Sequence, residues 1–188
     1  DVLRLDLSSN RASFDNLKSL RLGLLARLHA LSTDITPDER QRYKARIEYG
    51  DFSDGNQRRA AQVEGEFRVR THPEIWLGAR YYSFRFSQQL DNGYFNPKRF
   101  ESAHVTAKLD WRPAGDSGRW NLAAYAALGR EHAVPDGSKP AYDLSLVSGW
   151  RIDARTRVEA RAQRFSSRTT GLSGFARNSL GAFLEKAW

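Results

Sequence analysis

Four histidines and one pair of closely spaced glutamates are the residues of this 188-residue chain that could transfer protons or bind a metal ion. Glu64 and Glu66 are two positions apart, so on an extended strand they lie on one face. Arg68 continues that face, which makes ion pairing a better explanation for the two carboxylates than an acid–base pair. The histidines lie on four separate segments, at His29, His72, His104 and His132. None has a second ligand at metal-binding spacing, so we predict no catalytic residue, no metal site and no cofactor.

Other catalytic signatures are missing from the sequence as well. Cysteine is absent, which excludes disulfides, thiol catalysis and thiolate metal sites. No nucleophile elbow or phosphate-binding loop occurs in the chain. An enzyme is therefore not predicted, although a hydrolase embedded in a barrel, of the protease or lipase type, stays open as an alternative.

The net charge of +8 comes mainly from arginine, since only six of the 30 basic residues are lysines. Such a balance raises the question of nucleic-acid binding. The arginines, however, are dispersed through alternating segments and form no basic helix or arm. We therefore predict no nucleic-acid partner, and the direction in which the arginines point becomes the main question.

The segment 99–132 shows how the charged residues are positioned. On its first arm, one face is apolar and made of Ala103, Val105, Ala107, Leu109 and Trp111. The residues between them are polar or charged, and residues 120–128 repeat the alternation after a turn rich in Pro and Gly. Period-two alternation predicts a β-hairpin with one charge-free face. Each arm has about ten residues, the length that a tilted strand needs to cross a bilayer.

Comparable alternation recurs along the chain and predicts about ten strands. Besides the hairpin, these cover 1–8, 19–30, 42–52, 58–70, 75–86, 141–152, 157–165 and a last strand ending with 180–188. A helical period fits the stretch around 19–30 equally well, through Leu17, Leu20, Leu24, Leu28 and Leu31. The strand interpretation is preferred there because of Gly23 and the neighbouring strands, and 33–41 is predicted to be a turn.

The connections between the predicted strands alternate in length. Residues 71–74, 112–118 and 153–156 are predicted as short turns, and 87–98, 131–140 and 166–174 as long loops. Short turns on one side and longer loops on the other are typical of outer-membrane barrels. The predicted fold is therefore an all-β, antiparallel, up-and-down transmembrane β-barrel, with 1–188 as its single domain. A soluble lipocalin-like ligand-binding barrel, which shows the same alternation turned inside out, is the structural alternative.

If the apolar faces meet lipid, the opposite faces line a lumen. The lumen-lining candidates are Arg46, Glu48, Glu64, Glu66, Arg68, Arg80, Lys108, Asp110, Asp143, Arg151, Glu159 and Arg161. Arg21 and Arg27 are placed on the same polar face. Cross-strand ion pairing and an open, net positive path remain two interpretations of this wall. The aromatic residues predicted at the membrane interfaces are Trp111, Trp120, Tyr142, Trp150 and Trp188.

Three segments carry a resemblance to a known family: YGDFSDGNQRR at 49–59, GYFNPKRF at 93–100 and YDLSLVSGWRIDARTRVEA at 142–160. In order and spacing they resemble the C-terminal barrel of bacterial outer-membrane exopolysaccharide-export porins. The likeness is to the poly-β-1,6-N-acetylglucosamine export porin, and the cellulose-export outer-membrane subunit is similar. It runs from about Arg42 to the end of the chain.

The resemblance implies a porin of the bacterial outer membrane that exports a biofilm polymer. It implies the lipid bilayer and a polysaccharide as partners, together with a periplasmic tetratricopeptide domain and an inner-membrane synthase complex. Barrels of that family have roughly sixteen strands, whereas this chain shows about ten and no tetratricopeptide repeats. It is therefore expected to be part of a larger barrel or a shortened relative that closes alone.

One feature disagrees with the resemblance. A porin that exports a partly deacetylated, cationic glucosamine polymer should have an acidic lumen, because a wall of the opposite charge attracts the polymer. The predicted lumen face is basic instead. Either the polymer is neutral or anionic, or the acidic residues lie elsewhere in the barrel.

Overall fold

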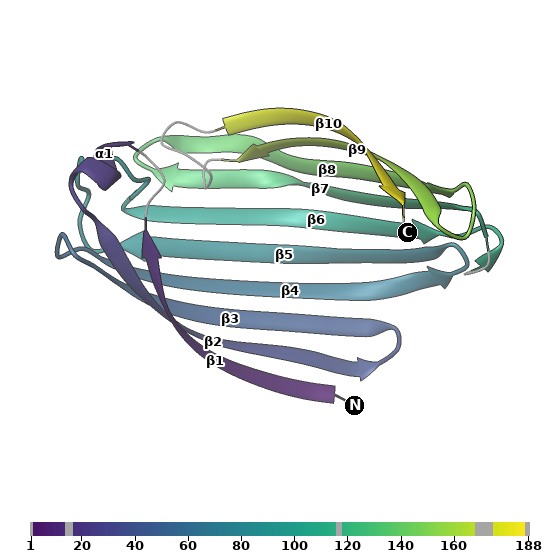
Figure 1. Ribbon diagram of the computed structural model, residues 1–188. Helices are drawn as coiled ribbons and strands as arrows, with labels where there is room; N and C mark the ends of the chain where they lie inside the picture. The colour runs from purple at the N-terminus through teal and green to yellow at the C-terminus, as the bar shows by residue number, and fades with distance from the viewer. Residues whose placement is uncertain (1, 14–16, 116–117, 168–174, 187–188) are drawn as a thin grey trace.

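The computed structural model describes residues 2–13, 17–115, 118–167 and 175–186. Ten antiparallel strands form one sheet in sequential order (Figure 1). They are β1 (Val2–Ser13), β2 (Leu25–Asp38), β3 (Gln41–Phe52), β4 (Gln57–Thr71), β5 (Glu74–Phe86), β6 (Arg99–Trp111), β7 (Trp120–Val134), β8 (Gly137–Arg151), β9 (Thr156–Ser167) and β10 (Phe175–Lys186). The described part of the chain also contains a short helix, α1 (Leu17–Arg21). The predicted all-β, up-and-down architecture of about ten long strands is confirmed.

The second strand begins and ends later than predicted. Instead of a strand from 19, the chain forms α1, which ends where Gly23 adopts a φ of +62°. The Gly23 N–H donates to the Leu20 carbonyl and the Leu24 N–H to the Ser19 carbonyl, the paired bonds of a Schellman cap. The predicted turn at 33–41 was wrong, because β2 runs to Asp38 and only two residues separate it from β3.

The predicted long loop at 131–140 was also wrong. The ladder between β7 and β8 continues through this stretch, pairing Glu131 with Lys139 and Ala133 with Gly137. The chain reverses at Pro135 and Asp136, and Gly137 follows with a φ of +81° that favours glycine. The connection between β6 and β7 is one residue longer than the turn predicted at 112–118, because β7 begins at Trp120.

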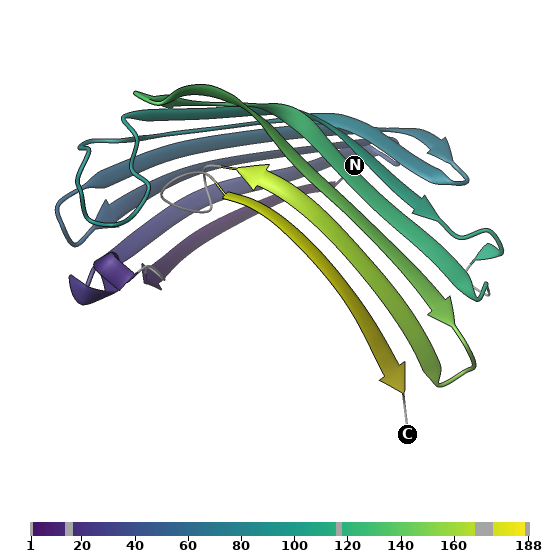
Figure 2. The ribbon, with the colours of Figure 1, turned by 90° about the horizontal axis from the view of Figure 1, so that it is seen from above.

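The sheet is curved into an open trough with a concave and a convex face (Figure 2). Within the described ranges no ladder pairs β1 with β10, so both edges of the trough are free. Side chains crowd on the inside of the curve: in β6, Ser102, His104 and Thr106 are buried, whereas Ala103 and Val105 between them are exposed. The polar side of the alternation is therefore concave and the apolar side convex.

The two ends of the trough differ. We call the end with the β1–β2, β3–β4, β5–β6 and β7–β8 connections the loop rim, and the end with the β2–β3, β4–β5, β6–β7 and β8–β9 connections the turn rim. No helix in the described part of the chain is long and apolar enough to cross a membrane. The main apolar cluster lies on the concave face at the loop rim and includes Phe52, Phe84, Phe86, Tyr94 and Phe100. We refer to these five residues as the aromatic cluster.

Candidate functional site

The convex face is an apolar band with large side chains open to the surroundings. The exposed fractions are 66% for Leu5, 65% for Val105 and 87% for Leu180, on strands at both edges and in the middle. Along β6 the apolar positions run from Ala103 to Trp111, and eight residue steps of about 3.3 Å span about 26 Å. This length matches the roughly nine to eleven residues that a tilted barrel strand needs to cross a bilayer. A soluble barrel would place this face inside, so the lipocalin-like alternative is wrong.

Tryptophan side chains mark the turn-rim boundary of the convex face. The rings of Trp111 and Trp120 meet edge to face, with centroids 5.1 Å apart. Trp120 pairs with Trp150 across the β7–β8 ladder, and its indole N–H donates to the hydroxyl of Ser148 (2.9 Å). These three tryptophans share the position predicted for interfacial residues. Tyr142 lies on the convex face but toward the loop rim, and Trp188 lies outside the described residues.

The strand registers place the predicted lumen-lining residues on the concave face. These are Arg46, Glu48, Glu64, Glu66, Arg68, Arg80, Lys108, Asp110, Asp143, Arg151, Glu159 and Arg161. Two further arginines do not belong with them. Arg27 pairs with Asp51 on the convex face, and Arg21 is in α1. Their misplacement follows from the late start of β2, because Leu20 and Leu22, which suggested the opposite apolar face, lie before the strand.

The arginines of the concave face are engaged with neighbouring side chains. Arg46 donates to Glu48 (2.9 Å), and Arg58 binds the other oxygen of the same carboxylate. At the turn rim Arg68 donates to Glu39 (3.0 Å). These contacts support the ion-pairing interpretation of the predicted wall.

Similar contacts continue across the middle of the wall. Lys108 pairs with Glu66 and approaches Glu64 at 3.7 Å, and Arg80 donates to the hydroxyl of Tyr125 (3.0 Å). On β9, Glu159 accepts hydrogen bonds from both Arg157 and Arg161.

Several residues of the concave face were missed in the sequence. Arg58 lies on the same face of β4 as Glu64 and Glu66. Following the two-residue alternation back to the start of the strand could therefore have identified it. Asp34 and Glu131 fall in stretches predicted as a turn and a loop, and the strands that present them were therefore not recognised. They add acid to a wall that the sequence predicted to be basic.

A polar cavity of about 350 Å³ is hollowed into the middle of the concave face. The concave residues that line it are Gln62, Arg80, Tyr82, Ser102, His104, Glu131, Asp143, Gln163 and Phe165. The Ser102 hydroxyl and the His104 ring nitrogen share a hydrogen bond of 3.1 Å at its floor, and both side chains are buried. We call this cavity the wall pocket. It presents amide, hydroxyl, carboxylate and guanidinium groups beside the rings of Tyr82 and Phe165.

The β5–β6 connection, residues 87–98, folds back over the concave face, and its Tyr94 joins the aromatic cluster. Tyr94 stacks on Phe52 of the sheet, with ring centroids 5.3 Å apart, and its hydroxyl donates to Asp54 (2.9 Å). The side-chain amide of Asn92 donates to the same carboxylate (2.9 Å), and the Asn92 carbonyl accepts from Ser19 (2.7 Å). The predicted long loop is therefore confirmed, and it covers the concave face at the loop rim.

These loop contacts shift two pKa values in opposite directions. Burial is the largest cause that raises the pKa of Tyr94 to about 12, and the neighbouring Asp54 carboxylate adds to it. Burial alone would also raise the pKa of Asp54. Hydrogen bonds from Asn92, from the Asn56 N–H and from Tyr94 outweigh it, so the pKa of that carboxyl is lowered. The ionised carboxylate and the neutral phenol are thus the forms that hold the loop.

The histidines are not brought together by the fold. His104 is buried in the concave face, His29 and His132 lie on the convex face, and His72 is in the β4–β5 turn. Among the residues that the structure describes, no three His, Asp or Glu side chains form a group that could hold a metal ion.

Comparison with known proteins agrees with this geometry. The model of the PgaA membrane beta barrel domain family matches residues 1–112, a range that starts before the resemblance noted from Arg42. A solved structure described as a bacterial polysaccharide outer membrane secretin superimposes with a TM-score of 0.77 at 18% sequence identity. The superposition covers 99% of this chain and 65% of that one, so the chain spans about two thirds of the length of the solved structure. No curated protein matches.

The solved structure supports the fold, and the family match supports kinship and location. The apolar convex band, the tryptophan boundary and the polar concave face of this chain are features of a transmembrane β-barrel. The chain is therefore a β-barrel segment of the bacterial outer membrane and belongs to the PgaA membrane beta barrel domain family.

Proposed function

We propose that the concave face is part of the wall of an aqueous channel through which an exopolysaccharide leaves the cell. The observation that carries this proposal is the wall itself: polar and charged side chains continue from rim to rim behind an apolar convex band. The family and the solved polysaccharide outer membrane secretin support the same class of cargo.

The wall pocket has the chemistry to contact a sugar unit. Gln62 and Gln163 offer amide donors and acceptors, and Asp143 offers an acceptor. Tyr82 and Phe165 provide ring faces on which the apolar side of a pyranose can rest. Because these groups come from strands on both sides of the trough, a chain passing along the concave face meets them together. Weak contacts of this kind suit a polymer that must slide.

The charge of the wall favours a glucosamine polymer over an anionic one. Around the wall pocket, five acids (Glu48, Glu64, Glu66, Glu131 and Asp143) lie among four cations (Arg46, Arg58, Arg80 and Lys108). The middle of the wall is therefore rich in carboxylates, although the whole chain is basic. We propose partly deacetylated poly-β-1,6-N-acetylglucosamine as the cargo, and a neutral cellulose-type polymer is the outcome that the test below separates from it.

Closure of the barrel is part of this proposal. Free backbone donors and acceptors at a sheet edge are very costly inside a bilayer, so β1 and β10 need strand partners there. We propose that further strands beside β1 and β10 complete the wall, as the larger size of the solved structure supports. A periplasmic tetratricopeptide domain and an inner-membrane synthase complex are the proposed partners that deliver the polymer.

The test uses planar bilayers with the barrel that contains this chain. Glucosamine oligomers added to one side should interrupt the ionic current, and the double variant Glu131→Gln/Asp143→Asn should shorten the interruptions. The matched control Asp51→Asn/Asp136→Asn removes the same charge from the convex face and a turn, and should behave as the parent. Equal interruption by cello-oligomers would favour the neutral polymer. Release of shorter sugars, peptides or fatty acids would instead support the hydrolase alternative.

A further inference from the structure

A row of arginines follows the loop-rim boundary of the convex face. Each lies on its own strand just beyond the apolar band, and each side chain is exposed. The members are Arg11 (β1), Arg27 (β2), Arg59 (β4), Arg85 (β5), Arg99 (β6) and Arg130 (β7). We call this set the arginine belt. None of it contributes to the concave wall described above.

The belt brings like charges directly together. Arg11 is the cross-strand partner of Arg27, and Arg59 is the partner of Arg85. The β5–β6 ladder ends with the pair of Phe84 and Phe100. Arg85 and Arg99 are the residues that follow this last pair, so they lie beside each other. Like charges opposite one another destabilise a sheet unless counter-charges lie close by.

Acidic neighbours do not neutralise this row. Arg99 donates to Glu101 (2.6 Å), and Asp51 is the cross-strand partner of Arg27. Within the described part of the chain, no ion pair joins Arg11, Arg59 or Arg85 to a carboxylate. The concave face differs, because most of its cations bind acids or hydroxyls. The belt therefore has positive charge that an external anion can satisfy.

The other rim of the same strands is built differently. Where β6 carries Arg99 at the loop rim, it carries Trp111 at the turn rim, and where β7 carries Arg130 it carries Trp120. Indole rings suit a boundary of ordinary phospholipid headgroups. Guanidinium groups bind phosphate through two parallel hydrogen bonds. The two rims therefore fit two leaflets of different composition.

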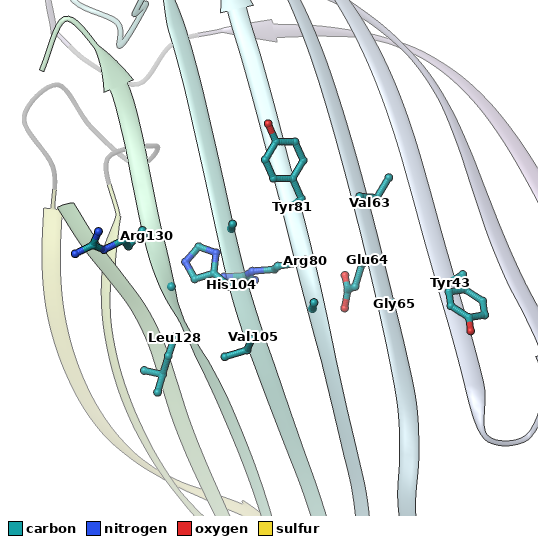
Figure 3. Close-up of a pocket in the computed structure, with 13 residues that line it drawn as sticks. Tyr43, Val63, Glu64, Gly65, Arg80, Tyr81, His104, Val105, Leu128 and Arg130 are labelled. Atoms are coloured by element: carbon teal, nitrogen blue, oxygen red, sulfur yellow. The ribbon is translucent and has the colours of Figure 1, made fainter. Parts of the chain in front are cut away.

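An apolar hollow of about 880 Å³ lies on the convex face directly below part of the belt (Figure 3). Small residues, including Gly65, Ala79 and Ala103, make it deep, and larger apolar side chains rise around it. Figure 3 shows Arg130 and Tyr81 nearer the loop rim than Leu128. An acyl chain lying in the hollow would bring its headgroup up to Arg130.

We propose that the arginine belt binds the phosphate groups of phosphorylated lipids in the outer leaflet, with an acyl chain seated in the apolar hollow. The inference goes beyond polymer export and rests on the outer-membrane location with the loop rim facing the cell exterior. Lipid phosphates would screen the paired arginines from one another, so the lipid would stabilise the sheet at this boundary. A lipid is preferred to free phosphate because the hollow offers apolar contact that an inorganic ion cannot use.

The test measures lipid retention by the folded barrel in a zwitterionic detergent, using native mass spectrometry and thermal unfolding. The probes are diphosphorylated lipid A, its dephosphorylated form and inorganic phosphate. The belt variant Arg59→Gln/Arg85→Gln/Arg99→Gln should retain the diphosphorylated lipid about tenfold less well, because charge-assisted bonds to phosphate are lost. The control Arg40→Gln/Arg70→Gln/Arg155→Gln removes the same charge near the turn rim and should retain it as the parent does.

A second variant probes the hollow independently of the charges. Ala103→Leu fills its floor and should weaken lipid retention while all the arginines remain. If the belt variant does not fold, this variant still decides the question. Equal losses in the belt and control variants, equal retention of the dephosphorylated lipid, or full competition by inorganic phosphate would each overturn the proposal.

Discussion

Tyr94 stacks on Phe52, with ring centroids 5.3 Å apart and ring planes 17° from parallel. The first ring belongs to the 87–98 connection and the second to the end of β3, so the contact ties a loop to the concave face. Together with the hydrogen bonds to Asp54, this stack anchors the loop to the loop rim of the sheet.

Loop anchoring should depend on pH at both extremes. The lowered pKa of Asp54 stabilises the anchored loop above the unfolded value of about 3.9, and this contribution is lost as pH falls through the folded pKa. The raised pKa of Tyr94 stabilises it below the unfolded value of about 10, and this contribution is lost as pH rises through about 12. A spin label at Gln89, in a chain without native cysteine, should become more mobile on both sides of this window.

The matched variant for that experiment is Tyr94→Phe. It keeps the stacking ring and removes only the hydroxyl, so the alkaline transition should disappear while the acidic one stays. A label at Asp136, in the β7–β8 turn, reports changes unrelated to the loop. Mobility at Gln89 that stays constant both far below and far above this window would contradict this account of the anchor.

The facing of β8 predicts opposite responses at neighbouring positions. Leu144 is on the convex face and 38% exposed, so Leu144→Arg places a charge in the hydrocarbon region and should cost about 2–4 kcal/mol near the midplane. Ser145 is on the concave face, where Ser145→Arg should be tolerated. Chemical unfolding of both variants in lipid vesicles makes the comparison. Equal tolerance at the two positions would show that the facing is wrong.

Replacing the concave arginines should affect stability more than ion selectivity. Arg46 and Arg161 bind carboxylates of the wall, Arg80 binds the Tyr125 hydroxyl, and Arg68 binds the exposed Glu39 of the β2–β3 turn. Changing all four to Gln should therefore lower the unfolding temperature, since the partly buried carboxylates of Glu48 and Glu159 lose partners. The reversal potential in planar bilayers should move little. A stable variant with a large shift toward cation selectivity would support the open, positively charged path instead.

A backbone approach makes Gly129 irreplaceable. A Cβ built on this residue would lie 1.9 Å from the carbonyl oxygen of Ala103 on the neighbouring strand, and backbone cannot move aside cheaply. Gly129→Ala should therefore distort the β6–β7 ladder and lower stability by several kcal/mol, about as much as other severe steric changes in a core. Gly65→Ala is the control, because its Cβ would meet only the Tyr43 ring, at 3.3 Å. Similar unfolding midpoints for the two variants would contradict the close backbone approach at Gly129.

Much of the fold was predictable because strand alternation is a local property. The apolar run from Ala103 to Trp111 determines which side of β6 is apolar, whatever its neighbours are. Residues of β4, β8 and β9 followed from the same rule, and so did the choice of a membrane barrel. The rule failed at β2, where leucines fit both a helical and a two-residue period and a cap at Gly23 decided between them.

Contacts across the sheet were decided only by the tertiary structure. Arg58 meets Glu48 because the β3–β4 register brings them close, and neither residue's own segment specifies that register. Tyr94 meets Phe52 because the 87–98 connection folds inward, although its length and polarity are equally compatible with an outward loop. The arginine belt likewise exists only once the registers align six strands. The sequence by itself determined the two faces of each strand; pairing, curvature and loop packing, which join residues far apart in the chain, determined what those faces contact.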